Sequence, residues 1–355
     1  MKKHNFSAGP CILPQSVFQK AADAVLNFNG IDLSILEISH RSKDFVAVME
    51  RARALVLEHL DLQDKGYEAL FLQGGASMQF LMVAYNLLDK KAAYLDTGTW
   101  ANKSIKEAKL LGEVAVVASS KDDNYNYIPK GYTIPSDADY FHCTSNNTIF
   151  GTQMQSFPET DVPLVCDMSS DIFSRQLNFS QFDLIYAGAQ KNMGPAGATL
   201  VVVKKELLGK VNRAIPSMLN YETHISKDSM FNTPPVFSIY VSMLTLEWLK
   251  AQGGITAIEQ VNREKAALLY SEIDRNPLFK GFVANAEDRS IMNVTFNLTD
   301  ASLKERFDAM LQDARINGLN GHRSVGGYRA SMYNALSLDS VQVLVDVMQK
   351  LEQKS

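Results

Sequence analysis

The fold is best inferred from residues 184–197, LIYAGAQKNMGPAG, in which a short apolar run leads directly into small residues around one lysine. The apolar run predicts a buried β-strand over 184–186. A lysine among alanine and glycine just past such a strand is unusual, because surface lysines normally stand among polar residues. Burial lowers the pKa of a lysine amine, and a neutral amine can form a Schiff base. The pattern alone fits a structural Lys191 as well as a catalytic one.

Short apolar runs on both sides of this stretch alternate with helical patterns. Apolar strands separated by helices predict a mostly parallel sheet covered on both faces, and therefore an α/β fold. We expect strands over 67–72, 92–95, 114–117, 140–143, 164–166 and 199–203, and helices over 77–88 and 100–111.

The rhythm changes after Pro235, where two long helices are expected over 236–250 and 255–273. The tail is α+β in character, with strands over 291–296 and 328–333 and helices over 302–314 and 339–352. We expect a large domain over residues 15–255, and a smaller α+β domain made of residues 1–14, which form an extended arm, together with residues 256–355.

The composition excludes several classes of protein. The 355 residues carry 35 Lys+Arg against 39 Asp+Glu, so the basic footprint of a nucleic-acid-binding protein is absent. Three cysteines cannot form a disulfide framework and fit a reducing compartment. The polar N-terminus does not resemble a signal peptide, and apolar runs of roughly five to eight residues are too short to span a bilayer. We expect a cytoplasmic enzyme with no membrane partner.

Several polar residues follow the expected strands, and ligands of open α/β sheets lie beyond the carboxyl ends of the strands. Asp167 follows the run 163–166; an acid there suits a pyridinium nitrogen, although a turn or a helix cap is the better explanation when this residue is read alone. The turn 73–77, QGGAS, can bind an anion at a helix N-terminus but matches no nucleotide-binding fingerprint. Trp100 can stack on a planar ring or fill the core.

Cationic side chains gather in three short motifs, at His40-Arg41, His322-Arg323 and Arg329. Guanidinium groups bind both phosphate and carboxylate bidentately, so these motifs suit a substrate that carries both groups. Each of them taken singly also fits an ordinary surface charge.

Five motifs, in order along the whole chain, resemble the phosphoserine aminotransferase family, a class of fold-type I enzymes that depend on pyridoxal 5′-phosphate (PLP). They are NFSAGP at 5–10, ISHRS at 38–42, YAGAQKNMGPAG at 186–197, NTPP at 232–235 and GHRSVGGYRAS at 321–331. The resemblance implies a fold-type I transferase with a mostly parallel central sheet, a bound PLP and a homodimer with shared active sites.

The resemblance also implies roles around the cofactor. Lys191 would be the Schiff-base lysine, Asp167 would pair with the pyridine nitrogen, and Trp100 would stack on the ring. Thr148 would contact the cofactor near its phenolic oxygen. The cofactor phosphate would be held by Ala76, Ser77 and Gln190, and by Asn232 and Thr233 of the partner subunit.

For the substrate, the resemblance implies that Arg41 and Arg329 bind carboxylates with help from Ser7. Some family members carry an arginine where this chain has Ser77. The distal phosphate or carboxylate would then depend on the remaining cations. These are His40, Arg41, His322, Arg323 and Arg329. No metal is expected.

The reaction implied is the reversible transfer of an amino group from L-glutamate to 3-phosphohydroxypyruvate, giving O-phospho-L-serine and 2-oxoglutarate in L-serine biosynthesis. In some bacteria the family also acts on a phosphorylated hydroxythreonine in pyridoxine biosynthesis, and this breadth stays open. Lys191 would act as general base and acid between substrate and cofactor.

Four other functions fit parts of the sequence less well. A cysteine desulfurase needs a reactive cysteine, whereas Cys143 and Cys166 lie on expected strands and Cys11 lies in the arm. An alanine–glyoxylate-type transaminase would not need so many cations. A dinucleotide-binding oxidoreductase lacks its fingerprint and leaves Lys191 unexplained. A non-catalytic protein with this fold is hard to reconcile with a complete set of site residues.

Overall fold

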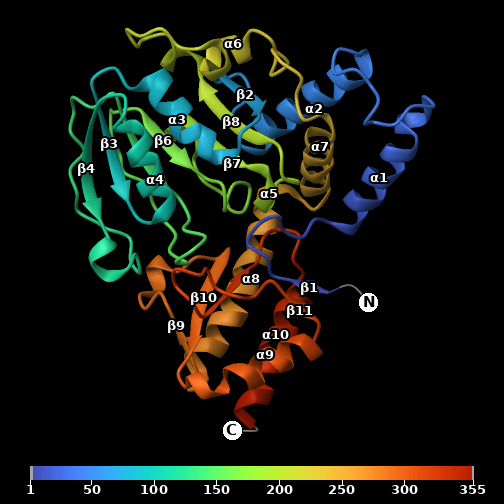
Figure 1. The fold of residues 1–355 in the computed structure, drawn as a ribbon, viewed down its shortest axis with the longest axis vertical. Coiled ribbons are helices and arrows are strands. Elements are labelled where there is room, and N and C mark those ends of the chain that lie inside the picture. Colours follow the sequence, from blue (N-terminus) through green and yellow to red (C-terminus); the bar gives the residue numbers. More distant parts are fainter. Residues whose placement is uncertain (1–2, 354–355) are drawn as a thin grey trace.

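The computed structural model describes residues 3–353. The residues before and after them, 1–2 and 354–355, belong to the expected small domain and lie outside the described residues. The chain forms an α/β part, which contains the large sheet, and a C-terminal part, which runs from α8 to α10 (Figure 1). No helix among residues 3–353 combines the length and the apolar character needed to cross a membrane.

The described part of the chain contains a seven-stranded sheet with the order β2-β8-β7-β6-β5-β3-β4. Only β8 runs antiparallel to its neighbours, so the sheet is mostly parallel, as expected. The strands are β2 Tyr67–Leu72, β3 Lys91–Asp96, β4 Glu113–Ser119, β5 Tyr140–Thr144, β6 Leu164–Asp167, β7 Leu184–Gly188 and β8 Thr199–Lys204.

Helices cover both faces of this sheet, and alternate side chains of each strand face opposite layers. On β5, Tyr140 packs into the core under α3 and α4, while Phe141 packs into the core under α1, α2 and α7. Both faces are therefore buried, which explains the continuous apolar runs. The helices are α1 Gln15–Leu26, α2 Lys43–His59, α3 Gly75–Leu87, α4 Thr99–Ala108, α5 Ala189–Asn192, α6 Tyr221–Ile225 and α7 Val236–Ala251.

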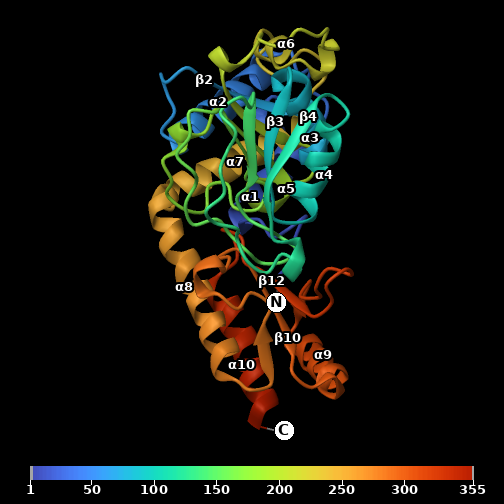
Figure 2. The ribbon, with the colours of Figure 1, turned by 90° about the vertical axis from the view of Figure 1, so that its left-hand side faces the viewer.

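The C-terminal part packs three helices around a small antiparallel sheet of order β12-β10-β9. Its elements are α8 Gly254–Arg275, β9 Phe279–Gly281, β10 Asn293–Leu298, α9 Lys304–Asp313, β11 Ile316–Asn317, β12 Tyr328–Ser331 and α10 Leu338–Gln353. The long helix α8 runs down one side of the molecule (Figure 2).

The N-terminal arm joins the C-terminal part. Its short strand β1, His4–Asn5, pairs in parallel with β11 at the far end of the sequence (Figure 1). The backbone N–H of Ser331 also donates to the carbonyl of Phe6. The domain boundary expected at 255/256 stays a prediction; α8 begins two residues before it.

Candidate active site

The candidate site lies where parallel strands end. The strands β3, β5, β6 and β7 end at Asp96, Thr144, Asp167 and Gly188 on one edge of the sheet. Because the carboxyl ends of neighbouring parallel strands meet at the same edge, the turns that follow them converge there. Lys191 lies in the short helix α5, directly after β7.

The Lys191 amine has a hydrogen-bond partner and a lowered pKa. Its Nζ donates to Thr148 Oγ1 at 2.7 Å and lies 5.8 Å from the ring centroid of Trp100. Burial lowers the pKa of Lys191 to about 8; the charge of Asp167 opposes this shift and that of Arg329 adds to it. About a tenth of this amine is therefore neutral at pH 7, far more than of an ordinary surface lysine.

Asp167 is a buried carboxyl group, 4% exposed, at the end of β6. Burial raises its pKa, while the hydrogen bonds from Ser169 and the charge of Lys191 lower it. One carboxylate oxygen accepts the backbone N–H of Ser169 at 2.9 Å. A cationic ring nitrogen beside this group would favour its ionised form.

Trp100 lies in the first turn of α4, and its ring is near the Lys191 amine. Its indole Nε1 is buried and has no acceptor among residues 3–353. Lys103 lies three residues further along the same helix, and its Nζ lies 4.6 Å from the Trp100 ring centroid. Lys103 was not expected at the site; its spacing of three from Trp100 was the available signal.

Arg329 extends from β12 of the C-terminal part to the same place. Its Nη1 donates to the carbonyl of Thr148 at 3.2 Å, so Thr148 contacts both Arg329 and Lys191. The Arg329 Nε is buried without an acceptor in the described part of the chain. His322 bonds to Ser324 at 2.6 Å, and burial and the charge of Arg329 lower its pKa.

The arm covers the lysine turn, which the sequence did not indicate. The backbone N–H of Cys11 donates to the carbonyl of Gln190 at 3.2 Å, and its thiol donates to the carbonyl of Lys191. A Cβ at Gly9, whose φ is +141°, would lie 3.3 Å from the Lys191 side chain. Ser7, expected to assist the substrate arginines, bonds to Asn5 at 2.6 Å.

The N-terminus of α3 provides an open anion position. Gly74 and Gly75 have φ values of 90° and 67°, and no side chain caps the helix that begins at Gly75. The free N–H groups of such a first turn favour a phosphate. Ala76 and Ser77 lie in this turn, as the expected phosphate site requires.

Four expected residues are not joined to this centre within one chain. Among residues 3–353, no hydrogen bond or ion pair links His40, Arg41, Asn232 or Thr233 to Lys191 or Asp167. The carbonyl of Thr233 instead accepts from Gln73 Nε2 at 2.6 Å, and Asn232 lines a surface cavity beside Gly74.

The residues fit a planar, anionic cofactor. Trp100 supplies an aromatic face and a buried indole N–H that has no acceptor among residues 3–353. Asp167 supplies a buried acid, and Lys191 supplies an amine whose pKa is lowered to about 8. The open N-terminus of α3 adds an anion position. This donor set matches the ring, nitrogen, aldehyde and phosphate of PLP.

Comparison with known proteins agrees with this site. Residues 3–344 match the family model described as aminotransferase class-V. A phosphoserine aminotransferase of Flavobacterium psychrophilum is 72% identical over 356 residues, covering 100% of both chains. This chain belongs to the phosphoserine aminotransferase family. The family member of Parabacteroides distasonis is 61% identical, again over 100% of both chains.

Solved structures of the family have the same fold. The phosphoserine aminotransferase of Bacillus circulans subsp. alkalophilus superposes with a TM-score of 0.96 at 43% identity, covering 99% of each chain. The PLP-bound enzyme of Trichomonas vaginalis gives 0.93 at 34% identity, covering 98% of this chain and 100% of the other. The expected family, fold class, enzyme class and cofactor are confirmed.

The desulfurase alternative loses its support in this family context. Burial raises the pKa of the Cys11 thiol to about 12, which opposes formation of a reactive thiolate. Cys143 and Cys166 are fully buried on neighbouring strands. Cys11 lacks the low pKa, and Cys143 and Cys166 lack the access, that a sulfur-transfer nucleophile needs.

Proposed function

We propose that this protein transfers an amino group reversibly between L-glutamate and 3-phosphohydroxypyruvate, giving O-phospho-L-serine and 2-oxoglutarate. The observation that carries the proposal is the Lys191–Thr148–Arg329 contact. It places an amine with a pKa of about 8 beside a cation able to hold a substrate carboxylate. Family membership supports the substrate assignment. We also propose a role in L-serine biosynthesis, and leave action on a phosphorylated hydroxythreonine to experiment.

PLP, when bound, supplies an electron sink for the negative charge that develops on the substrate Cα. We assign Asp167 to the ring nitrogen, where its carboxylate keeps that nitrogen protonated, and Trp100 to the ring face. Thr148 would contact the ring substituent beside Lys191. The phosphate would be held by Ala76, Ser77 and Gln190, and by Asn232 and Thr233 of the partner subunit.

Lys191 would move the proton. Its neutral Nζ takes the proton from the substrate Cα and returns it on the cofactor side. The Thr148 hydroxyl, 2.7 Å from this nitrogen, orients the amine in the structure. The covering arm, through Cys11, holds the backbone of the same turn by two hydrogen bonds.

The cations would hold the two anionic ends of the substrate. Arg329 and Arg41, assisted by Ser7, would bind carboxylates. His40, His322 and Arg323 would bind the distal phosphate or carboxylate. Burial lowers the pKa of His322, and the charges of Arg329, Arg323 and Lys103 lower it further, which supports a common positive field at this place.

We propose a cytoplasmic homodimer with shared sites. The Thr233 carbonyl accepts from Gln73, and Asn232 lines a cavity beside Gly74. Neither residue bonds to Lys191 among residues 3–353, which supports a role toward a second subunit. Met218, which lines the same cavity, and Phe231, which precedes Asn232 in the sequence, are both exposed. A partner subunit would cover them. We also retain the division into residues 15–255 and residues 1–14 with 256–355 as a proposal.

The test is the absorption spectrum of the purified holoenzyme, before and after O-phospho-L-serine, with L-serine in parallel. We expect phosphoserine to convert the bound pyridoxal form into the pyridoxamine form, and serine to have little effect. An unchanged spectrum with phosphoserine would overturn the substrate assignment. The absence of any cofactor band after incubation with PLP would overturn the role of Lys191.

A further inference from the structure

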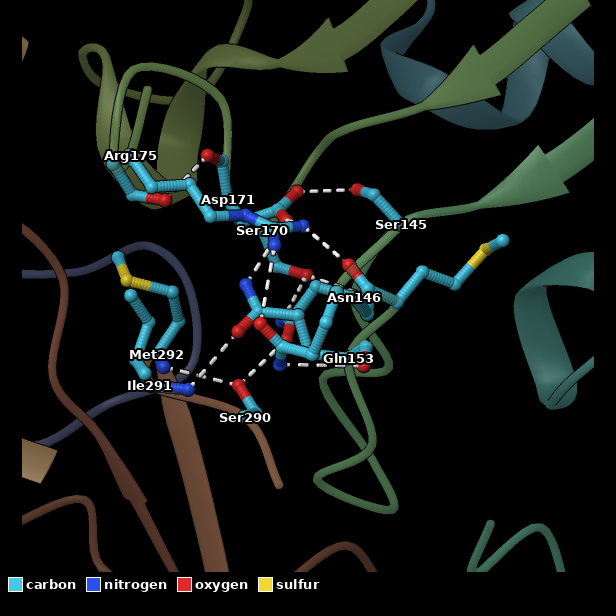
Figure 3. Close-up of polar contacts among 12 residues, drawn as sticks. Ser145, Asn146, Gln153, Ser170, Asp171, Arg175, Ser290, Ile291 and Met292 are labelled. Atoms are coloured by element: carbon cyan, nitrogen blue, oxygen red, sulfur yellow. Dashed lines mark hydrogen bonds and ion pairs between the residues drawn. The ribbon is translucent and has the colours of Figure 1, made fainter. Parts of the chain in front are cut away.

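A buried amide network crosses from the α/β part to the C-terminal part beside the proposed site. Asn146, 2% exposed, lies in the turn after β5, two residues before Thr148. Its Nδ2 donates to Ser170 Oγ at 2.8 Å and to Asn293 Oδ1 at 2.7 Å, and its Oδ1 accepts from Ser290 Oγ at 2.5 Å. Figure 3 shows Asn146, Ser170 and Ser290 turned toward one another from three segments of the chain.

The network continues from Asn293 to the strand that bears Arg329. Asn293 begins β10 and is paired with Ser331 of β12, and its Nδ2 donates to Ser331 Oγ at 2.9 Å. Arg329 precedes Ser331 by two residues, so both side chains lie on the same face of β12. The position of Asn293 therefore constrains that of Arg329.

These contacts close into a ring. Arg329 donates to the carbonyl of Thr148 at 3.2 Å, and the Thr148 hydroxyl accepts from Lys191 at 2.7 Å. The path from Thr148 through Asn146, Asn293 and β12 returns to Thr148 by way of Arg329. A closed ring of hydrogen bonds and short backbone segments restricts the distance between the Lys191 amine and the Arg329 guanidinium more than either contact alone would.

We propose that Asn146 is a positioning residue that sets Arg329 in register with Lys191. The inference rests on the proposed function, in which Arg329 holds a substrate carboxylate while Lys191 moves the proton. The planar amide of Asn146 presents two donors, to Asn293 and Ser170, and one acceptor, to Ser290. A misplacement of about 1 Å at a reacting centre can cost about a hundredfold in rate.

The test compares Asn146→Ala with Asn276→Ala in the holoenzyme. Asn276 is an equally buried amide, 1% exposed, whose Nδ2 bonds to Glu272 at 2.8 Å within the C-terminal part. We expect Asn146→Ala to lower kcat/KM by about tenfold to a hundredfold. The loss should be equal for glutamate and phosphoserine, because this proposal assigns Arg329 to the α-carboxylate, which both substrates carry. Binding of glutarate, measured by calorimetry, should weaken as well.

We expect Asn276→Ala to lower the thermal midpoint while kcat/KM stays unchanged. The inference is overturned if Asn146→Ala also changes only the thermal midpoint, or if its loss differs between the two substrates. Should Asn146→Ala not yield folded protein, Ser331→Ala removes the last hydroxyl of the network with a minimal change of volume. A smaller loss, equal for both substrates, supports the inference, and unchanged kcat/KM overturns it.

A double-mutant cycle with Arg329→Lys separates this inference from the proposed function. If Asn146 acts through Arg329, the loss caused by Asn146→Ala should shrink in the Arg329→Lys background. An undiminished loss there overturns the positioning role while the proposed function stands. If Arg329→Lys alone changes neither substrate's kcat/KM, the proposed role of Arg329 fails, and the inference fails with it.

Discussion

At the scale of single residues, the surroundings of Lys191 differ from those of a surface lysine. Its amine bonds to one hydroxyl, Thr148, and its pKa is set by burial against the opposing charge of Asp167. The amine can therefore exist in both its neutral and its protonated form within the physiological pH range, as the Schiff-base and proton-transfer role that we propose requires.

This pKa predicts how the apoprotein takes up PLP. Only the neutral amine attacks an aldehyde, so we expect the uptake rate to rise with pH through about 8 and to level off above it. In Asp167→Asn the midpoint should move to lower pH, because the Asp167 charge raises the pKa of Lys191. Stopped-flow absorbance measures both midpoints.

The exposed Lys106 on α4 provides the control, since Lys106→Met should leave the midpoint unchanged. A midpoint close to 10.4, the ordinary lysine value, would show that Lys191 is not desolvated in solution.

At the scale of secondary-structure elements, Lys265 of α8 holds the segment that follows β12. Its Nζ is fully buried and donates to the carbonyls of Met332, Tyr333 and Leu336 at 3.0, 2.9 and 3.1 Å. An ammonium group has three N–H donors, one for each of these carbonyls. The contact therefore links α8 to the segment between β12 and α10.

We expect Lys265→Met to lower the free energy of unfolding by about 3 kcal/mol, because it keeps the aliphatic chain but leaves buried carbonyls without donors. Urea unfolding followed by circular dichroism measures this loss. The matched substitution Lys280→Met, at an exposed residue of β9, should change the free energy of unfolding little. Equal stability of the two variants would show that water replaces the Lys265 contacts.

Helices α1 and α2 are the longest of the elements that the sequence expectations omit. A signal for α2 was present: Ser42 accepts the N–H of Phe45 at 3.4 Å as an N-cap, and buried Phe45, Val48, Met49 and Ala52 recur at helical spacing. Charged residues between these positions dilute the apolar pattern. The sheet strands, buried on both faces, were easier to predict because their apolar runs are continuous.

At the scale of the whole molecule, the proposed shared site predicts complementation between two inactive variants. In a Lys191→Ala subunit paired with an Asn232→Ala subunit, one site would combine the intact Lys191 of one chain with the intact Asn232 of the other. We expect the mixed dimer, isolated with two affinity tags, to regain activity that neither parent homodimer has.

If Asn232 serves its own chain instead, every site of the mixed dimer carries one substitution and no activity returns. Refolding each variant alone through the same mixing procedure controls for recovery that does not depend on subunit exchange.

Apolar patterns in the sequence marked residues of the candidate site only at the ends of strands. Lys191 and Asp167 stand out because each follows a continuous apolar run. The thiol of Cys11 contacts a carbonyl 180 residues away, and Asn146 meets Asn293 across 147 residues. No local pattern marks such pairs, because their meeting depends on how the arm and the C-terminal part pack on the sheet.

The sequence by itself indicated the α/β class, and its family motifs indicated the family, the cofactor and the roles that we propose for Lys191 and Asp167. These follow from short-range apolar patterns and from motifs within a few residues of one another. Only the tertiary structure decided that Thr148 joins Lys191 to Arg329, that the arm covers the lysine turn and that Asn146 links the two parts of the chain. Such hydrogen bonds form over about 3 Å between distant segments, so they depend on the packing of the whole molecule.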